Sequence, residues 1–314
     1  MSAPDPARSE ERLATSPALG GLYARAGLAA ARDAVTAPVR RVLGGTGDEP
    51  ADLPVRTLRL DDLRPDPAHL TAYQHLLGEP AADALPAGYL HVLAFPLTTA
   101  LLVRPDFPLP ALGMVHLSNR VELREPVRLG DRLDIRAWAQ DLRPHPTGTQ
   151  VDLVAEVRRH GAASGSPAAW HGVSTYLARG VRLGDQAGDT ARPARERFEA
   201  PLPTGRWALD AGVGRRYAAV SGDANPIHLH PLSARALGFP RAIAHGMYTA
   251  ARALADVGAR RGDTYAWDVD FAAPVLLPST PVVRVAPADD GWDVTAWDAR
   301  RGRLHLRTRV RPLG

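Results

Sequence analysis

The sequence predicts an α+β protein made of two similar units, in each of which an antiparallel sheet wraps one long helix. Two pairs of similar strings support a duplication. Residues 72–79 read A-Y-Q-H-L-L-G-E and residues 216–223 read R-Y-A-A-V-S-G-D; residues 120–127 read R-V-E-L-R-E-P-V and residues 268–275 read D-V-D-F-A-A-P-V. The offsets of the two pairs are 144 and 148 residues. A nearly constant offset is typical of a repeated structural unit, although strings this short also match by chance.

Each half contains the same order of expected elements, namely a short helix, a longer apolar helix and several strands. We expect the longer helices at 89–103 and 246–257. Segments rich in Val, Thr and Trp, with alternating apolar and polar residues, are typical of a sheet that is covered on one face. The expected strands are 115–123, 131–140, 150–158 and 170–178 in the first half, and 264–271, 281–286, 292–298 and 304–310 in the second.

The N-terminal residues differ in composition from both units. Residues 13–43 are rich in Ala and Arg, and Leu19, Leu22, Tyr23 and Ala26 recur at loose helical spacing. We expect a helix packed on the body or a mobile tail, in preference to a helix on a membrane surface. A second segment rich in Gly, Pro, Arg and Asp reads as a linker. The expected division is an N-terminal extension at 1–50, a first unit at 51–183, a linker at 184–203 and a second unit at 204–314.

The composition excludes several classes of function. The 314 residues include no cysteine and no lysine, so disulfides, thiolate metal sites, Schiff-base chemistry and a Walker A site are excluded. The net charge of +4 is small, and Arg is interleaved with Asp and Glu, which argues against nucleic acid as a partner. No apolar run reaches the ~18 residues of an integral membrane span, and the first residues lack the pattern of a secretory signal. We therefore expect a cytoplasmic protein.

The expected active site begins at residues 221–228, which read S-G-D-A-N-P-I-H. The carboxylate of Asp223 and the imidazole of His228 are separated by a short turn that Asn225 can cap. This turn would bring both side chains to one side of the chain. Such a pair can hold a water molecule between them, one group taking a proton while the other gives one.

A third group is expected from residues 243–248, which read I-A-H-G-M-Y. Gly246 stands where the second long helix begins. Its N–H group, aided by the helix dipole, can bind a carbonyl oxygen that gains negative charge. We expect the preceding residue, His245, to support the site rather than to take part in proton transfer.

A metal site is the alternative use of the histidines here. His228, His230 and His245 together could suggest metal ligands. His228 and His230 are only two residues apart, however, and Asp223 is the only acidic residue at a suitable spacing. We therefore predict that the site holds no metal.

Residues 217–251 closely resemble the hydratase-2 motif of the MaoC-like family, the (R)-specific enoyl-thioester hydratases and dehydratases of hot-dog fold. Residues 271–278, F-A-A-P-V-L-L-P, resemble the strand that follows the helix in that family. The resemblance implies that Asp223 and His228 are the catalytic acid–base pair. It also implies that the amide of Gly246 binds the thioester oxygen.

Four further positions have expected roles, of which the first comes from the same resemblance. Asn225 corresponds to the asparagine that supports the water site. Ser221, His245 and Met247 are expected to line the substrate site.

The first half resembles the degenerate N-terminal repeat of double-hot-dog members, in particular actinobacterial 3-hydroxyacyl-thioester dehydratases. Residues 85–97 and 113–120 carry this resemblance. Glu79 stands where the second half has Asp223, and no N-P-x-H string follows it. The resemblance therefore implies a double hot dog, in which the two helix-wrapped sheets are joined edge to edge, with one active site per chain. It also implies that the degenerate half makes room for a long acyl chain; Phe95 and Phe107 could line that room, but core packing is the expected role.

The implied reaction is reversible hydration of trans-2-enoyl thioesters to (R)-3-hydroxyacyl thioesters in fatty-acid metabolism. The implied partner is an acyl-CoA or acyl-carrier-protein thioester, whose phosphopantetheine is part of the substrate, and no separate cofactor is expected. A homodimer of such chains is compatible with the family. A hot-dog thioesterase and a non-catalytic acyl-thioester-binding subunit are the alternatives. The D-x-N-P-x-H string argues against both.

Overall fold

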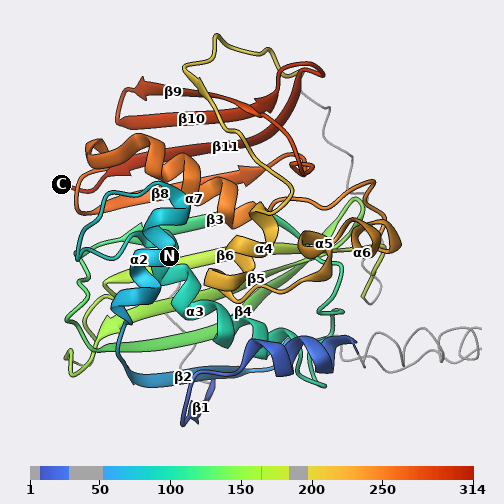
Figure 1. The fold of residues 1–314 in the computed structure, drawn as a ribbon. Helices are drawn as coiled ribbons and strands as arrows, with labels where there is room; N and C mark the ends of the chain where they lie inside the picture. The colour runs from blue at the N-terminus through green and yellow to red at the C-terminus, as the bar shows by residue number, and fades with distance from the viewer. Residues whose placement is uncertain (1–7, 28–51, 164, 184–196) are drawn as a thin grey trace, which may run out of the picture.

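The computed structural model describes residues 8–27, 52–163, 165–183 and 197–314. These residues form one sheet of eleven strands with helices packed against it (Figure 1). The first half contributes β2 (Arg56–Leu63), α2 (Pro67–Leu77), α3 (Ala87–Leu102), β3 (Val115–Leu123), β4 (Leu133–His145), β5 (Gly148–Arg159) and β6 (Trp170–Arg179). The second half contributes β7 (Gly205–Arg206), α4 (Val213–Ser221), α5 (Pro226–Leu229), α6 (Pro231–Ala236), α7 (Gly246–Val257), the short 3₁₀ helix η1 (Gly258–Arg261), β8 (Tyr265–Phe271), β9 (Val282–Ala288), β10 (Gly291–Asp298) and β11 (Arg303–Pro312).

The strand order has an internal symmetry. With β1 (Ser9–Leu13) at one edge, it runs β1-β2-β4-β5-β6-β3-β8-β11-β10-β9-β7, so the order from β3 outward through the first half is mirrored from β8 outward through the second. The two halves meet where β3 pairs with β8 in antiparallel register, from Ser118 opposite Asp270 to Leu123 opposite Tyr265. The predicted double hot dog, with its sheets joined edge to edge, is thus confirmed.

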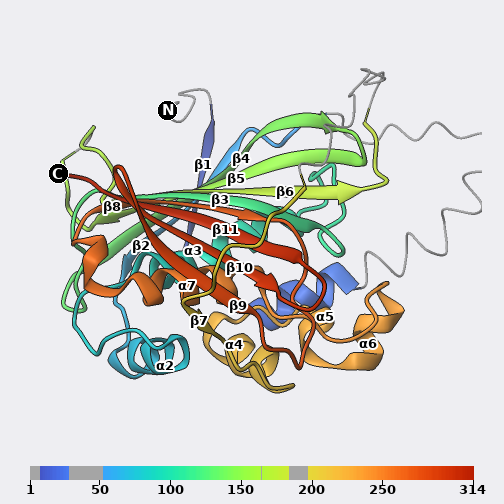
Figure 2. The same cartoon turned by 90° about the horizontal axis from the view of Figure 1, so that it is seen from above.

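The two long helices lie against the same face of the sheet, which curves over them (Figure 2). Both supply apolar residues to one continuous core, including Leu90 and Leu97 from α3 and Leu254 from α7. The helices approach closely at Gly88, where an added Cβ would lie 3.2 Å from the Cβ of Ala251. Small residues at this crossing allow both units to share a single interior.

The N-terminal residues join this body. β1 (Ser9–Leu13) pairs in parallel with β2, and residues 19–27 are helical. Leu22 and Ala26 are buried, as a helix packed on the body requires. The rest of the predicted helical segment, residues 28–43, lies outside the described residues, as do residues 184–196 of the predicted linker. Among the described helices, none has both the length and the apolar character to cross a bilayer.

Candidate active site

The loop that carries Asp223 is shaped by the end of α4. The helix ends at Gly222, whose left-handed backbone (φ 73°) and N–H bond to Ala218 O form a C-cap that favours glycine. Ser221 Oγ donates to Tyr217 O and accepts a hydrogen bond from the Asp223 N–H. The hydroxyl of Ser221, predicted to contact substrate, is therefore engaged in holding this turn.

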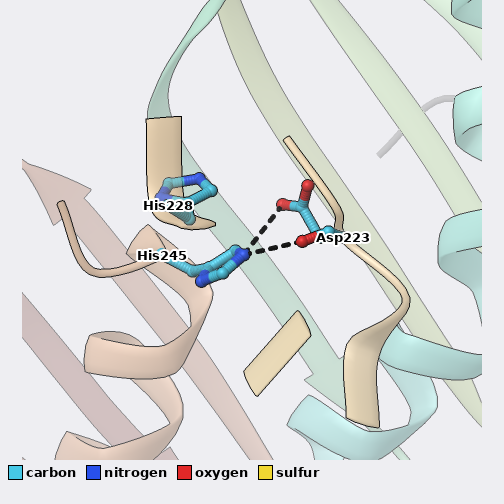
Figure 3. Close-up of side chains that lie close together, drawn as sticks. All are labelled: Asp223, His228 and His245. Atoms are coloured by element: carbon cyan, nitrogen blue, oxygen red, sulfur yellow. Dashed lines mark hydrogen bonds and ion pairs between the residues drawn. The ribbon is translucent and has the colours of Figure 1, made fainter. Parts of the chain in front are cut away.

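Asn225 fixes both the carboxylate and the next helix. Its side chain caps α5 by accepting from the Ile227 N–H, and its own N–H donates to Asp223 Oδ1 at 3.2 Å. Pro226 occupies the first turn of α5, where a missing N–H costs nothing. The single turn of α5 then presents His228 on the same side as Asp223, as predicted (Figure 3).

The imidazole of His228 is held in one tautomer by the backbone. Its Nδ1 lies 2.8 Å from Ile243 O, and since a carbonyl only accepts, Nδ1 carries the proton. Burial, followed by the neighbouring His245, lowers the pKa of His228 to about 3. The ring is therefore neutral near pH 7, and Nε2 has a lone pair that forms no hydrogen bond with the described residues.

His245 ties the second long helix to the Asp223 loop. It is the N-cap residue of α7, its Nε2 donates to the backbone oxygen of Asp223 at 2.9 Å, and this nitrogen lies 3.8 Å from Asp223 Oδ2 (Figure 3). Its ring stacks on that of His228, with centroids 3.6 Å apart. These contacts hold the start of α7 against the Asp223 loop, and the supporting role of His245 in the reaction stays a prediction.

Gly246 follows as the first residue of α7. At this position an N–H group has no carbonyl one turn earlier in the helix to donate to, so it is available to an acceptor outside the helix. Phe271 from β8 lies against it, since an added Cβ on Gly246 would be 3.2 Å from the phenyl ring. The carboxylate, the imidazole and the helix start are thus brought together as the sequence predicts.

The carboxyl of Asp223 is ionised in this setting. Burial works to raise its pKa, but His245, His228 and hydrogen bonds from Tyr23 and Asn225 outweigh burial and hold the pKa below its ordinary value. The site therefore combines a charged carboxylate with a neutral imidazole. Both groups can accept hydrogen bonds from a bound water, and a proton taken from that water can then be returned to the substrate.

The chain is similar to proteins of known family. Residues 206–295 match the family model described as the MaoC like domain. The chain is 38% identical over 261 residues to 3-hydroxyacyl-thioester dehydratase X of Mycobacterium tuberculosis, a match that covers 83% of this chain and 91% of that protein. The chain belongs to the MaoC-like family. The resemblance predicted from the motif is confirmed.

Solved structures support the same assignment. The crystal structure of HtdX of M. tuberculosis is 37% identical, with a TM-score of 0.71, and the match covers 82% of this chain and 100% of that one. A MaoC-like dehydratase from Phytophthora capsici is 20% identical, with a TM-score of 0.61 and coverage of 82% and 95%. At that identity, the second match shows only that the fold is shared.

Side chains of the first half also surround the site of this MaoC-like chain. His116 from β3 stacks on Tyr176 from β6 at 4.4 Å between centroids and lies 4.9 Å from the ring of Phe271. Burial lowers the pKa of His116 to about 3 and that of His91, on α3, to about 4. Sequence reasoning missed these histidines because they are far from the motif. They form an uncharged, largely aromatic wall beside the carboxylate.

The remaining residues named from the sequence, Met247, Phe95 and Phe107, are described by their packing. Met247 is buried in the main core, and its contact with substrate stays a prediction. Phe107 is buried in a smaller core cluster, in line with the packing role expected for it. Phe95 is half-buried, with its ring 6.2 Å from that of His91.

Of the residues considered as metal ligands, three lie close enough together to bind one ion. Possible donor atoms of Asp223, His228 and His245 all lie within 4.8 Å of one another. His230 faces elsewhere, because its Nδ1 accepts from the Leu232 N–H and caps α6. Since Nδ1 of His228 and Nε2 of His245 already donate to backbone carbonyls, only the opposite ring nitrogens remain as ligands.

A further residue beside the carboxylate also lies outside the motif. Tyr23, in the helical residues 19–27, donates its phenolic hydrogen to Asp223 Oδ1 at an O–O distance of 2.5 Å. The apolar spacing of this segment predicted a packed helix, but no local signal linked it to a position 200 residues away.

Proposed function

We propose that this chain catalyses the reversible hydration of trans-2-enoyl thioesters to (R)-3-hydroxyacyl thioesters. The observation that carries the proposal is the grouping of an ionised carboxylate, a neutral imidazole with an open nitrogen, and the first amide of α7. Membership of the MaoC-like family and the name of the M. tuberculosis relative support the same reaction class.

In the hydration direction, Asp223 and His228 hold the attacking water. Its oxygen forms a bond to C3 of the enoyl group as the C2–C3 π electrons move toward the thioester carbonyl. One proton of the water passes to this pair, and the pair returns a proton to C2, so that H and OH are added overall. Since His228 is neutral with Nδ1 occupied, Nε2 is the atom that can accept the proton. Dehydration uses the same groups in reverse.

The amide of Gly246 stabilises the charge that develops on the thioester oxygen. An enolate-like oxygen gains negative charge as C3 is attacked, and a preorganised N–H at a helix start stabilises that charge more than it stabilises the uncharged carbonyl. Asn225 supports this arrangement through its N–H bond to Asp223. No redox group or metal has a step in this mechanism.

The first half takes no part in chemistry in this proposal, so each chain has one active site. The carboxylate of Glu79 is ion-paired with Arg261 at 2.8 Å, and the first amide of α3, from Ala87, donates to Tyr265 Oη at 3.2 Å. Both groups are already engaged. The first half instead contributes His91 and His116 to the wall of the site and makes room for the acyl chain.

A groove rich in arginine is a candidate binding place for the phosphates of CoA or of a carrier-protein phosphopantetheine. It has a volume of about 710 Å³ and is lined by Arg241, Arg300, Arg301 and Arg303, among others. Its wall at residues 274–278 is hydrogen-bonded to residues 242–244, which lead directly into the start of α7. Arginine clusters suit phosphate because each guanidinium offers several N–H donors. In this proposal the protein acts in the cytoplasm, where such carriers are found. The proposed reaction is compatible with a homodimer, because each chain has its own active site.

Replacement of the exposed arginines would test this groove. We expect Arg300→Ala with Arg303→Ala to raise the KM for an enoyl-CoA while leaving the KM for a truncated enoyl-pantetheine unchanged, because the truncated substrate has no phosphate to bind. An equal change for both substrates would place the phosphates elsewhere.

The reaction itself is tested with purified protein and trans-2-enoyl-CoA substrates from crotonyl-CoA to long chains. Hydration removes the conjugated absorbance, and release of free thiol is followed in parallel. We expect the absorbance to fall without thiol release. Inactivity at every chain length would overturn the proposal, and stoichiometric thiol release would assign a thioesterase instead.

A further inference from the structure

The N-terminal extension is anchored to the sheet by β1 and reaches the active site with the helical residues 19–27. β1 adds to the edge of the sheet, with five residues in register with β2. Glu11 on β1 forms ion pairs with Arg56 at 2.9 Å and with Arg104 at 3.1 Å. These contacts anchor β1, the segment that precedes the helical residues 19–27, and so limit where that helix can lie.

The helix packs closely on the catalytic loop. Leu22 and Ala26 are buried, and a Cβ added to Gly222 would come within 2.2 Å of Leu19 Cδ1. The glycine that shapes the loop before Asp223 thus also leaves space for this helix. A shift of the helix would uncover both the loop and the phenol that bonds to it.

The two oxygens of Asp223 have different surroundings. Oδ1 accepts from Tyr23 Oη at 2.5 Å and from the Asn225 N–H at 3.2 Å. Oδ2 is the oxygen that faces His245, at 3.8 Å, on the side where the stacked His228 lies. Two donors therefore hold Oδ1, and Oδ2 is left to accept a hydrogen bond from the reacting water.

We propose that Tyr23 is a positioning residue of the active site, which orients the catalytic carboxylate by fixing Oδ1 and directing Oδ2 at the reacting water. The inference rests on the proposed function, and it assigns a part of the catalytic apparatus to the N-terminal extension. Tyr23 acts through Asp223 and does not itself exchange a proton with the substrate.

The charges at the site suit this role. Burial, followed by the nearby Asp223, raises the pKa of Tyr23, so the phenol stays protonated and remains a donor at any working pH. Its hydrogen bond in turn helps to keep the pKa of Asp223 low against the effect of burial. The other titratable groups that face Asp223 are His91, His116, Tyr176, Tyr217, His228 and His245.

The first test is Tyr23→Phe in the full chain, which keeps the ring and removes the hydroxyl. We expect kcat for enoyl-thioester hydration to fall about 10- to 100-fold, because a hydrogen bond to a charged group is lost, while KM changes little. The acid limb of kcat/KM should move to higher pH, because a donor that favours the ionised carboxylate is gone. Tyr265→Phe is the matched control, since it removes a buried phenol that bonds to the Ala87 N–H at the start of α3.

A wild-type kcat and pH profile in Tyr23→Phe would overturn the proposal. So would a higher kcat, which is the result expected if the helix merely occupied the substrate site. If wild-type protein were inactive on all enoyl thioesters, the proposed function would fail, and the contact would be judged by unfolding in denaturant. In that measurement Tyr23→Phe should lower the midpoint in wild-type protein but much less in Asp223→Ala. Equal shifts in both backgrounds would show that the two side chains are not coupled and would overturn the proposal.

Discussion

The two halves of this chain share a backbone frame, namely a helix, a glycine C-cap, an acid and a long helix, but the acid has different partners in each half. In each, a helix ends at a left-handed glycine, Gly78 or Gly222, and the next residue is an acid, Glu79 or Asp223. In each, a long helix then begins near that acid. The frame is set by backbone geometry that both sequences satisfy, so the fold is preserved where the chemistry is not.

The difference lies in what the acid and the helix start contact. The side chain of Glu79 is only 1% exposed and forms a two-pronged ion pair with Arg261, and the first amide of α3 donates to Tyr265. Asp223 instead faces His228 and His245, and the first amide of α7 is left open to a ligand. A charged group that is fully paired inside the fold contributes structure, whereas one that keeps an unsatisfied oxygen can contribute chemistry.

Replacing the imidazole should have the largest effect. We expect His228→Gln to lower kcat about 10²–10⁴-fold, because the open nitrogen that accepts the proton is lost while the side-chain volume is nearly kept. The measurement is steady-state hydration of an enoyl-CoA. His230→Gln is the control, since that histidine caps α6 and should leave kcat unchanged. Similar losses in both variants would mean that the effect is structural.

Removing the amide at the start of α7 should have the next largest effect. Proline is tolerated at the first position of a helix but has no N–H, so Gly246→Pro should reduce kcat about 10²–10³-fold. Gly246→Ala keeps the N–H and adds a similar contact with Phe271, which makes it the steric control. If alanine were as damaging as proline, the loss would come from crowding rather than from the missing donor.

Breaking the ion pair between Glu79 of the first half and Arg261 of the second half should cost stability and not activity. We expect Arg261→Met to destabilise the fold by about 3 kcal/mol, because Glu79 is left charged and buried without a partner. Denaturant unfolding measures the loss, and kcat at a temperature where the variant is folded measures the chemistry. Arg132→Met, which breaks an exposed pair with Asp62, should cost far less. A fall in kcat matching that of the catalytic variants would give the first half a chemical role.

Acidification should weaken the fold through the imidazoles near Asp223. The folded protein binds protons on His91, His116 and His228 only near pH 3–4, whereas the unfolded chain binds them near pH 6.5. The unfolded state therefore takes up more protons, and stability falls as the pH drops below about 6.5. For three such groups we expect a loss of about 2 kcal/mol between pH 7 and pH 6 in denaturant unfolding. His116→Phe should reduce the slope; an unchanged slope would mean that this ring is not buried as a neutral group.

Local patterns in the sequence predicted much of the frame and the central site. The strand at 115–123 and the helix at 246–257 have the predicted bounds, because alternation and helical periodicity are local properties. The grouping of Asp223 with His228 follows from a capped turn of six residues. The pairing of β3 with β8 was expected only as an edge-to-edge junction, without its register.

Long-range contacts account for what the sequence did not predict. The bond from Tyr23 to Asp223, the pairing of Glu79 with Arg261 and the capping of α3 by Tyr265 each join residues well over 100 positions apart. A tyrosine in an amphipathic helix carries no sign of which acid it will meet. The same holds for Glu79, whose departure from the motif predicted inactivity but not the partner that neutralises it.

The most direct test compares the two acids in one assay. Asp223→Asn and Glu79→Gln each remove one charge from corresponding positions of the two halves, and kcat for enoyl-CoA hydration is measured for both. We predict a loss of about 10²–10⁴-fold for Asp223→Asn and a wild-type kcat for folded Glu79→Gln. Full activity of Asp223→Asn, or an equal loss in Glu79→Gln, would contradict the assignment of a single active site to the second half.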